Sequence, residues 1–272
     1  MKSIFSSVLF YVCFIGAAFA AKVDTIEVFS KAMNKGIKTV TILPDNYNTG
    51  KEFPVIYLLH GYGGGYGDWV NRAPTIKDLA DRYSLIIVCP DGGKGSWYWD
   101  SPEDPAFKFE TFVASELVSW VDSNLKTRKT REGRAITGLS MGGHGALYLA
   151  FKHQDVFGAA GSTAGGVDIR PFPLRWDMAK RLGSYAENKQ RWEDNTVINM
   201  THLLTPGSLE LIIDCGIGDF FYQINENLHD LLLERNIPHT YVTGPGAHNW
   251  DYWKNSINFQ ILFMHQFFQR VK

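Results

Sequence analysis

The sequence predicts an α/β protein with a mostly parallel, eight-stranded sheet, helices on both faces and one inserted segment. Eight short apolar runs alternate with helical patterns, which is typical of a parallel sheet covered on two sides. No linker rich in Pro, Gly or Ser divides the 272 residues. A glycine-flanked serine also lies between one predicted strand and one predicted helix. We therefore expect one domain built on a single sheet.

The composition argues against several other classes of protein. The chain has 27 Lys and Arg against 28 Asp and Glu, a formal net charge of −1, and no block of like charges. Nucleic-acid binding and stable attachment to an anionic membrane both depend on clustered positive charge, so we predict neither partner. The sequence also lacks heptads, internal repeats and low-complexity tracts, which argues against a coiled coil, a solenoid or a disordered chain.

Residues 1–20 have the pattern of a secretory signal peptide. Lys2 precedes an apolar run over residues 8–21, and Ala18-Phe19-Ala20 has the small-x-small ending of a cleavage site. The run is too short to span a bilayer, which needs roughly 20 residues. We predict cleavage after Ala20, export to the periplasm or the exterior, and a mature domain over residues 21–272. An N-terminal anchor left in place is the alternative.

The predicted strands are short apolar runs bounded by turn-forming residues. The first two are expected to pair antiparallel, because only the turn Asn34-Lys35-Gly36 separates them. Most of the others are separated by helical patterns, as parallel strands require. The candidates are residues 23–29, 37–43, 54–59, 85–89, 134–137, 159–162, 209–214 and 239–243.

Five further segments have helical patterns. In the segment 109–125 the apolar residues fall at helical spacing, so this helix is expected to pack one face against the core. Residues 165–207, between the sixth and seventh predicted strands, are irregular and contain Pro and Trp. We interpret them as an insertion. The helix candidates are residues 75–83, 109–125, 141–152, 224–235 and 255–270.

The motif GLSMG at residues 138–142 predicts a serine nucleophile. It matches G-x-S-x-G, and its context is the expected one, with a strand before it and a helix after it. A serine on such a turn projects its hydroxyl above the sheet, and flanking glycines remove side chains that would collide in the turn. Ser140 is therefore the predicted nucleophile, with a buried serine on a packing turn as the alternative. His144, early in the following helix, is expected to pack.

A serine hydroxyl needs a base, and the base needs an orienting carboxylate. In a parallel α/β sheet, both are expected in loops at the carboxyl ends of later strands. His248 lies in the loop after the last predicted strand and is the predicted base. Asp219 lies in the loop after the preceding strand and is the predicted carboxylate, with Asp214 second and Asp251 third.

Acyl transfer also requires donors directed at the oxygen that becomes negative. We predict the backbone N–H groups of Met141, directly after the serine, and of Tyr62, in the glycine-rich loop 60–65. His60 is expected to brace that loop. The sequence contains no G-x-x-x-x-G-K-[ST], H-E-x-x-H or paired C-x-x-C motif, so no cofactor and no metal are predicted.

Taken together, these motifs resemble the putative-esterase branch of the α/β-hydrolases. This branch includes S-formylglutathione hydrolases, tributyrin esterases, feruloyl and acetyl-xylan esterases of carbohydrate esterase family one, and mycolyltransferases. The resemblance covers most of the mature chain and implies the α/β-hydrolase fold and the triad Ser140, Asp219 and His248. Ala247 departs from the usual Gly, without an expected consequence. The matching segments are LLHGYGG (58–64), PDG (90–92) with SWY (96–98), FETF (109–112) with Glu116-Leu117, GLSMGG (138–143), DCG (214–216) with Asp219, and GAHNW (246–250) with Tyr252 and Trp253.

The resemblance also bears on the two cysteines of the mature chain, Cys89 and Cys215. In the strand order of an α/β-hydrolase their strands are about four positions apart, or roughly 19 Å at the usual strand spacing. A disulfide needs Cα atoms within about 7 Å. We expect two free, buried thiols.

Aromatic residues are dense in the loops expected around the serine. Trp97, Tyr98, Trp99, Phe220 and Trp250 are the predicted substrate-binding residues, because aromatic faces suit a phenolic acyl group or a sugar. The alternative is that many of them pack in the core. In the insertion, Trp176 and Trp192 are each a candidate pocket wall or a candidate anchor.

These observations predict an exported serine carboxylic-ester hydrolase acting on feruloyl or acetyl esters of plant polysaccharide. Export argues against a glutathione thioester, because that substrate is chiefly cytosolic. The alternatives are a general short-chain esterase or a thioesterase like S-formylglutathione hydrolase, an exported acyltransferase, and a non-catalytic binding module. The expected partner is an ester substrate, and the sequence does not indicate an oligomeric state.

Overall fold

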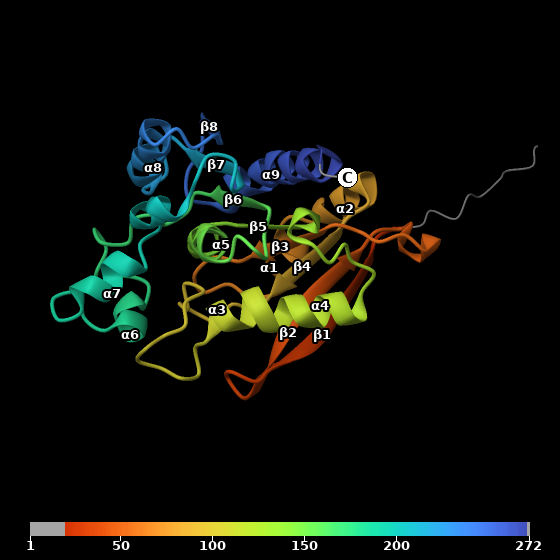
Figure 1. Cartoon of the computed structure of the whole chain (residues 1–272), viewed down its shortest axis with the longest axis horizontal. Coiled ribbons are helices and arrows are strands. Elements are labelled where there is room, and N and C mark those ends of the chain that lie inside the picture. The colour runs from red at the N-terminus through yellow and green to blue at the C-terminus, as the bar shows by residue number, and fades with distance from the viewer. Residues whose placement is uncertain (1–19, 271–272) are drawn as a thin grey trace, which may run out of the picture.

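A computed structural model describes residues 20–270 and contains one eight-stranded sheet in the order β1-β2-β4-β3-β5-β6-β7-β8 (Figure 1). β2 pairs antiparallel with β1 and β4, and all other neighbours are parallel. All eight predicted strands are present, and the predicted fold class is confirmed. The strands are β1 (Lys22–Ser30), β2 (Lys35–Leu43), β3 (Val55–Leu59), β4 (Ile86–Pro90), β5 (Arg134–Gly138), β6 (Ala159–Thr163), β7 (Glu210–Gly216) and β8 (Thr240–Gly244).

The segment with the signal-peptide pattern lies outside the described residues, except for Ala20. Within residues 20–270, no helix is long and apolar enough to cross a membrane.

Helices cover both faces of the sheet. Alternate residues of β3 belong to two separate apolar clusters, so the clusters lie on opposite faces. One cluster includes residues of α3, α4, α5 and α8, and the other includes residues of α1, α2 and α9. The helices are α1 (Asp68–Arg72), α2 (Ile76–Tyr83), α3 (Phe109–Thr111), α4 (Val118–Asn124), α5 (Met141–Lys152), α6 (Met178–Leu182), α7 (Lys189–Asp194), α8 (Tyr222–Glu234) and α9 (Trp250–Arg270).

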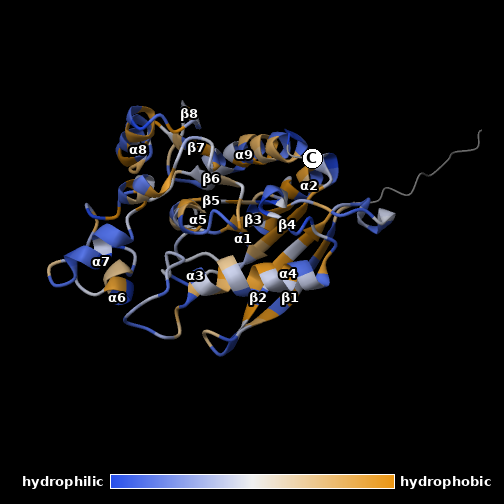
Figure 2. Ribbon diagram, in the orientation of Figure 1, coloured by the Kyte–Doolittle hydropathy of each residue, from blue (hydrophilic) through white to orange (hydrophobic). Residues whose placement is uncertain are grey.

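The central strands are buried along their whole length. Every residue of β3, β4, β5 and β6 is buried, and the apolar character of β3 and β4 is visible in Figure 2. The edge strand β1 instead alternates toward its end between exposed and buried residues. Continuous burial is typical of parallel strands covered on both faces, and it explains why the sequence shows apolar runs rather than strict alternation.

Two predicted helices differ from the structure. The segment 109–125 is interrupted by a π-helical turn at Phe112–Leu117, between α3 and α4. The apolar period of the sequence does not reveal such a turn, because it changes the backbone hydrogen bonds while its apolar residues remain buried. α9 begins at Trp250, five residues before the predicted start at 255. The Asn249 side chain accepts a hydrogen bond from the Tyr252 N–H (3.2 Å), as an N-cap residue does.

The insertion, residues 165–207, contains α6 and α7 and projects from the sheet at the left of Figure 1. Trp192 is fully buried within it, and its indole N–H donates to the Gly183 carbonyl (3.0 Å). Arg181 forms an ion pair with Asp104 (2.7 Å) that ties α6 to a loop of the main body. Trp192 is therefore an anchor of the insertion rather than a pocket wall.

Cys89 in β4 and Cys215 in β7 are both buried and free, as predicted. Their strands are four positions apart in the sheet order, which is too far for a disulfide. Burial raises the pKa of both thiols, so the reactive thiolate is disfavoured as well as inaccessible.

We predict that neither Cys89 nor Cys215 reacts with a thiol-specific disulfide reagent at pH 8 in the native protein, because both are buried. Both should react once guanidinium unfolds the chain, without prior reduction. Absorbance of the released reagent measures the reaction. Thiols that appear only after reduction would show a disulfide and contradict the strand order.

Candidate active site

Ser140 lies on a sharp turn between β5 and α5. Its backbone has φ 56° and ψ −117°, a conformation that non-glycine residues rarely adopt. The Ser140 N–H donates to the Thr163 carbonyl of β6 (2.9 Å), which holds the turn against the sheet. A Cβ atom on Gly138 or Gly142 would lie 2.6–2.7 Å from neighbouring backbone atoms. Glycine is therefore required on both sides of the serine.

The structure brings Ser140, His248 and Asp219 together in that order. His248 Nε2 lies 2.9 Å from Ser140 Oγ, and His248 Nδ1 lies 2.8 Å from Asp219 Oδ2. The ionised carboxylate only accepts hydrogen bonds, so Nδ1 carries the proton and Nε2 is free to accept the serine proton. The three residues follow β5, β8 and β7, at the carboxyl ends of three strands.

Burial and aromatic contacts hold this arrangement. The Asp219 side chain has no exposed surface, and its second oxygen accepts the Phe221 N–H (2.8 Å). The His248 ring lies 4.2 Å from the Phe220 ring and 5.0 Å from the Trp253 ring, measured between centroids. These contacts limit rotation of the imidazole.

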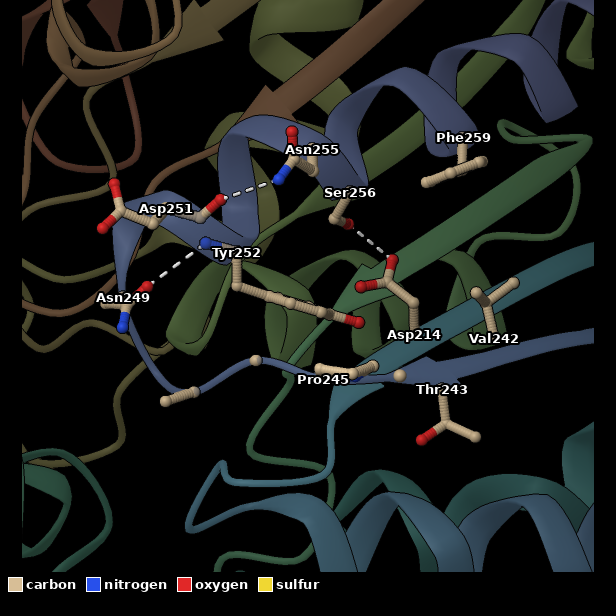
Figure 3. A pocket seen from close by; sticks show the side chains of 13 residues that line it. Asp214, Val242, Thr243, Pro245, Asn249, Asp251, Tyr252, Asn255, Ser256 and Phe259 are labelled. Atoms are coloured by element: carbon tan, nitrogen blue, oxygen red, sulfur yellow. Dashed lines mark hydrogen bonds between the residues drawn. The ribbon is translucent and has the colours of Figure 1, made fainter.

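The other two candidate carboxylates are placed elsewhere. Asp214 is buried, and its Oδ2 accepts hydrogen bonds from Thr163, Ser256 and Gln260 at 2.6–2.9 Å. Figure 3 shows the Asp214 carboxylate directed toward Ser256 and Tyr252. Burial raises the pKa of Asp214. These hydrogen bonds act in the opposite direction and lower it, but the effect of burial is larger. The Asp251 side chain is 94% exposed, so it does not orient the histidine.

The glycine-rich loop 60–65 passes beside the nucleophile. A Cβ atom on Gly61 would lie 3.4 Å from the Ser140 Cβ. His60 braces the loop, as expected, because its Nε2 accepts the Gly92 N–H (2.7 Å). The Tyr98 hydroxyl donates to the His60 carbonyl (3.1 Å). The loop thus has its own supports.

The predicted oxyanion donors belong to the two segments nearest the nucleophile. Met141 is the first residue of α5, where backbone N–H groups have no helical acceptor. Within residues 20–270, neither the Met141 N–H nor the Tyr62 N–H donates to another residue. Both groups are therefore available to a substrate oxygen.

A cavity of about 400 Å³ opens above Ser140. Tyr62, Phe220 and Trp250 line it, and Trp176 lines it from the insertion. The Trp176 and Phe220 rings stack, with centroids 5.8 Å apart and planes at 17°. Of the two tryptophans considered in the insertion, Trp176 forms the wall.

Asp68 and Arg72 also line the cavity, and no sequence motif had indicated them.

Three of the predicted substrate-binding residues are wrong. Trp97, Tyr98 and Trp99 are buried and do not line the cavity. Trp97 and Trp99 pack around His144, whose Nε2 accepts the Trp99 indole N–H (3.0 Å). Trp97 and Tyr98 have positive φ angles of 56° and 62°, so this segment adopts an unusual local turn. The sequence shows an aromatic loop but not that its side chains point into the core.

Comparison with known proteins is consistent with this geometry. A family model described as putative esterase matches residues 30–264. An acetyl esterase of Caldicellulosiruptor saccharolyticus is 30% identical over 252 residues, which cover 85% of this chain and 94% of the relative. The Ag85B diacylglycerol acyltransferase/mycolyltransferase of Mycobacterium leprae is 29% identical, with 87% and 81% covered. A solved ferulic acid esterase matches with a TM-score of 0.80 and 27% identity over 92% of this chain and 99% of its own.

The chain belongs to the putative esterase family. It is a carboxylic ester hydrolase with the α/β-hydrolase fold, and the family resemblance seen in its motifs is confirmed. An S-formylglutathione hydrolase of Staphylococcus aureus has the same fold at 21% identity and a TM-score of 0.78, covering 90% of this chain and 99% of its own. No group of three or more His, Cys, Asp or Glu residues suited to a metal ion occurs in the described part of this esterase.

We predict that Ser140→Ala reduces hydrolysis of 4-nitrophenyl acetate to below about one per cent of wild type, because the covalent route is lost. The substitution removes one hydroxyl next to an existing cavity and keeps the backbone of the turn, so the melting temperature should change by no more than a few degrees. Release of 4-nitrophenol and thermal unfolding provide the two measurements. Activity well above that level in the folded variant would show a different nucleophile.

We also predict different effects for the carboxylate within β7 and the carboxylate in the loop after it. Asp219→Asn should lower kcat by up to about 10⁴-fold, as loss of this role does in serine proteases. Asp214→Asn should mainly lower stability, by about 1–3 kcal/mol, because three buried donors lose their carboxyl acceptor. Steady-state kinetics and denaturant unfolding of both variants test this ranking, and the reverse ranking would assign the orienting role to Asp214.

Proposed function

We propose that this esterase is exported and removes feruloyl or acetyl groups from plant polysaccharide through an acyl-enzyme on Ser140. The observation that carries the mechanism is the continuous contact from Ser140 Oγ through His248 to the buried Asp219. Ser140 and His248 line one cavity, and the buried Asp219 contacts His248 from behind that cavity surface.

In the first half-reaction, Ser140 Oγ attacks the ester carbonyl carbon while His248 Nε2 takes the serine proton. The carbonyl oxygen becomes negative and accepts hydrogen bonds from the backbone N–H groups of Met141 and Tyr62. When the C–O bond to the alcohol breaks, the imidazolium gives its proton to the departing oxygen. The acyl group remains on Ser140.

In the second half-reaction, a water attacks the acyl-enzyme and His248 takes its proton. The tetrahedral intermediate then releases the acid, and Ser140 recovers its proton from the imidazolium. Asp219 keeps His248 in the required tautomer and stabilises the imidazolium in both steps. Its lack of exposed surface strengthens this effect, because little water screens the pair.

The substrate proposal rests on the cavity, on the relatives and on the signal-peptide pattern. Trp176, Phe220 and Trp250 provide flat apolar surfaces for a feruloyl ring or a sugar face. The acetyl esterase and ferulic acid esterase matches both extend over most of this chain. The pattern in residues 1–20 supports export, which would bring the enzyme to polysaccharide outside the cell.

Acyl transfer to another hydroxyl is a second candidate, supported by the similarity to the mycolyltransferase. It would share the acyl-enzyme and differ only in the nucleophile of the second half-reaction. Hydrolysis of acetylated and feruloylated xylo-oligosaccharides, with and without added glycerol or sugar, distinguishes the two. The proposal predicts free acid as the main product. New esters as the main product would favour transfer, and no turnover of any ester would overturn both.

We predict that Trp176→Ala changes the feruloyl-to-acetyl ratio of kcat/KM by more than about threefold, because Trp176 lines the cavity. The buried anchor Trp192 provides the control. Trp192→Phe should lower the melting temperature and leave the ratio unchanged. An unchanged ratio in Trp176→Ala would mean that the insertion does not select the substrate.

A further inference from the structure

The backbone of the cavity wall is held in an unusual conformation. Trp176 and Asp177, which directly precede α6, have φ angles of 49° and 58°. Two consecutive non-glycine residues in the left-handed region are disfavoured, and the surrounding structure must hold them there. The side chains of Trp176 and Asp177 are only partly buried, so specific contacts rather than core packing must fix this segment.

Three contacts converge on these two residues. The Tyr62 hydroxyl donates to Asp177 Oδ2 (2.9 Å), and Lys180 pairs with the other carboxylate oxygen (2.9 Å). The Trp97 indole N–H donates to the Trp176 carbonyl (3.1 Å). Trp97 is buried and fixed, whereas Tyr62 reaches Asp177 from the loop beside the nucleophile.

The Tyr62–Asp177 hydrogen bond has an ionised acceptor. The hydrogen bond with Lys180 lowers the pKa of Asp177 most. The hydrogen bond from Tyr62 lowers this pKa as well, whereas partial burial raises it. The carboxylate is therefore charged at neutral pH, and hydrogen bonds to charged acceptors are stronger than neutral ones. This bond joins the insertion to Tyr62, whose backbone N–H is the proposed second oxyanion donor.

Packing around this bond leaves little space for another arrangement. A Cβ atom on Gly95 would lie 3.0 Å from both the Asp177 Cβ and the Tyr62 ring. The loop 60–65 has supports other than Asp177, because the hydrogen bonds of His60 with Gly92 and Tyr98 also hold it. Loss of the bond should therefore release the insertion wall rather than the loop.

We propose that the Tyr62–Asp177 hydrogen bond fixes Trp176 above the nucleophile and makes Asp177 a positioning residue for selection between bulky and small esters. The proposal rests on the proposed ester hydrolysis at Ser140. Trp176 stacks on Phe220, which in turn packs on His248, so its position sets the width of the cavity. A displaced Trp176 would lose contact with a feruloyl ring, whereas an acetyl group is too small to reach it.

Asp177→Gly tests the kinetic consequence, because glycine removes the carboxylate and tolerates the left-handed backbone. The feruloyl-to-acetyl ratio of kcat/KM should fall by about fivefold or more, with acetyl kcat within about twofold of wild type. Lys180→Gln is the matched control, since it removes the ion pair and keeps the Tyr62 contact; its ratio should not change. Tyr62→Phe combined with Asp177→Gly should add little to the loss in either single variant.

The proposal would be overturned if Asp177→Gly left the feruloyl-to-acetyl ratio unchanged, or if Lys180→Gln lowered this ratio equally. It would also be overturned if the effects of Tyr62→Phe and Asp177→Gly on the ratio were independent in the double variant. Asp177→Asn, which keeps the side-chain size, replaces the glycine variant if the latter does not fold. Thermal unfolding of each variant separates a local effect from loss of the fold.

A second readout requires no ester. Arg175 is exposed directly before the wall, so trypsin cleavage after it reports how firmly the segment is held. Asp177→Gly and Tyr62→Phe should each be cleaved there about tenfold faster than wild type, and Lys180→Gln at the wild-type rate. Equal rates in all four proteins would overturn the proposal. Absence of ester turnover in wild type would instead overturn the proposed function, and the cleavage rates would still decide the positioning role.

Discussion

The turn at Ser140 is the constraint on which the rest of the site depends. A non-glycine residue is held at φ 56° between β5 and α5, and this is possible only because Gly138 and Gly142 lack side chains. The turn raises the hydroxyl above the sheet and begins α5 at Met141, whose N–H then has no helical acceptor. One local conformation thus positions both the nucleophile and an oxyanion donor. His248 then needs only to reach the Ser140 hydroxyl, and Asp219 needs only to reach His248.

Two carboxylates near the end of β7 serve different purposes because one residue lies in the strand and the other in the loop. Asp214 joins β6 and β7 to α9 through buried hydrogen bonds with Thr163, Ser256 and Gln260. The Thr163 carbonyl also accepts the Ser140 N–H, and α9 begins two residues after His248, so this network fixes the ends of the elements that carry the site. Asp219, five residues later, is free to contact His248.

Sequence reasoning predicted the sheet and brought together Ser140, His248 and Asp219, because parallel strands place their following loops at one edge. It did not reveal the π-helical turn, which leaves the apolar pattern intact, or the early start of α9. It was wrong for Trp97, Tyr98 and Trp99, because an aromatic residue in a glycine-rich loop has the same pattern whether it faces solvent or core. The position of Trp176 depends on contacts with Tyr62, Trp97 and Phe220, which are distant in sequence.

Covalent labelling tests most directly whether Ser140 is the nucleophile of an acyl-transfer site. A fluorophosphonate reacts with a serine only when a neighbouring base activates the hydroxyl, so the modified residue can be identified by peptide mass spectrometry. The structure predicts one adduct per chain, on the peptide containing Ser140, and labelling at least about 100-fold slower in His248→Gln. An adduct on another residue, no adduct at all, or equal labelling of the His248 variant would contradict the account.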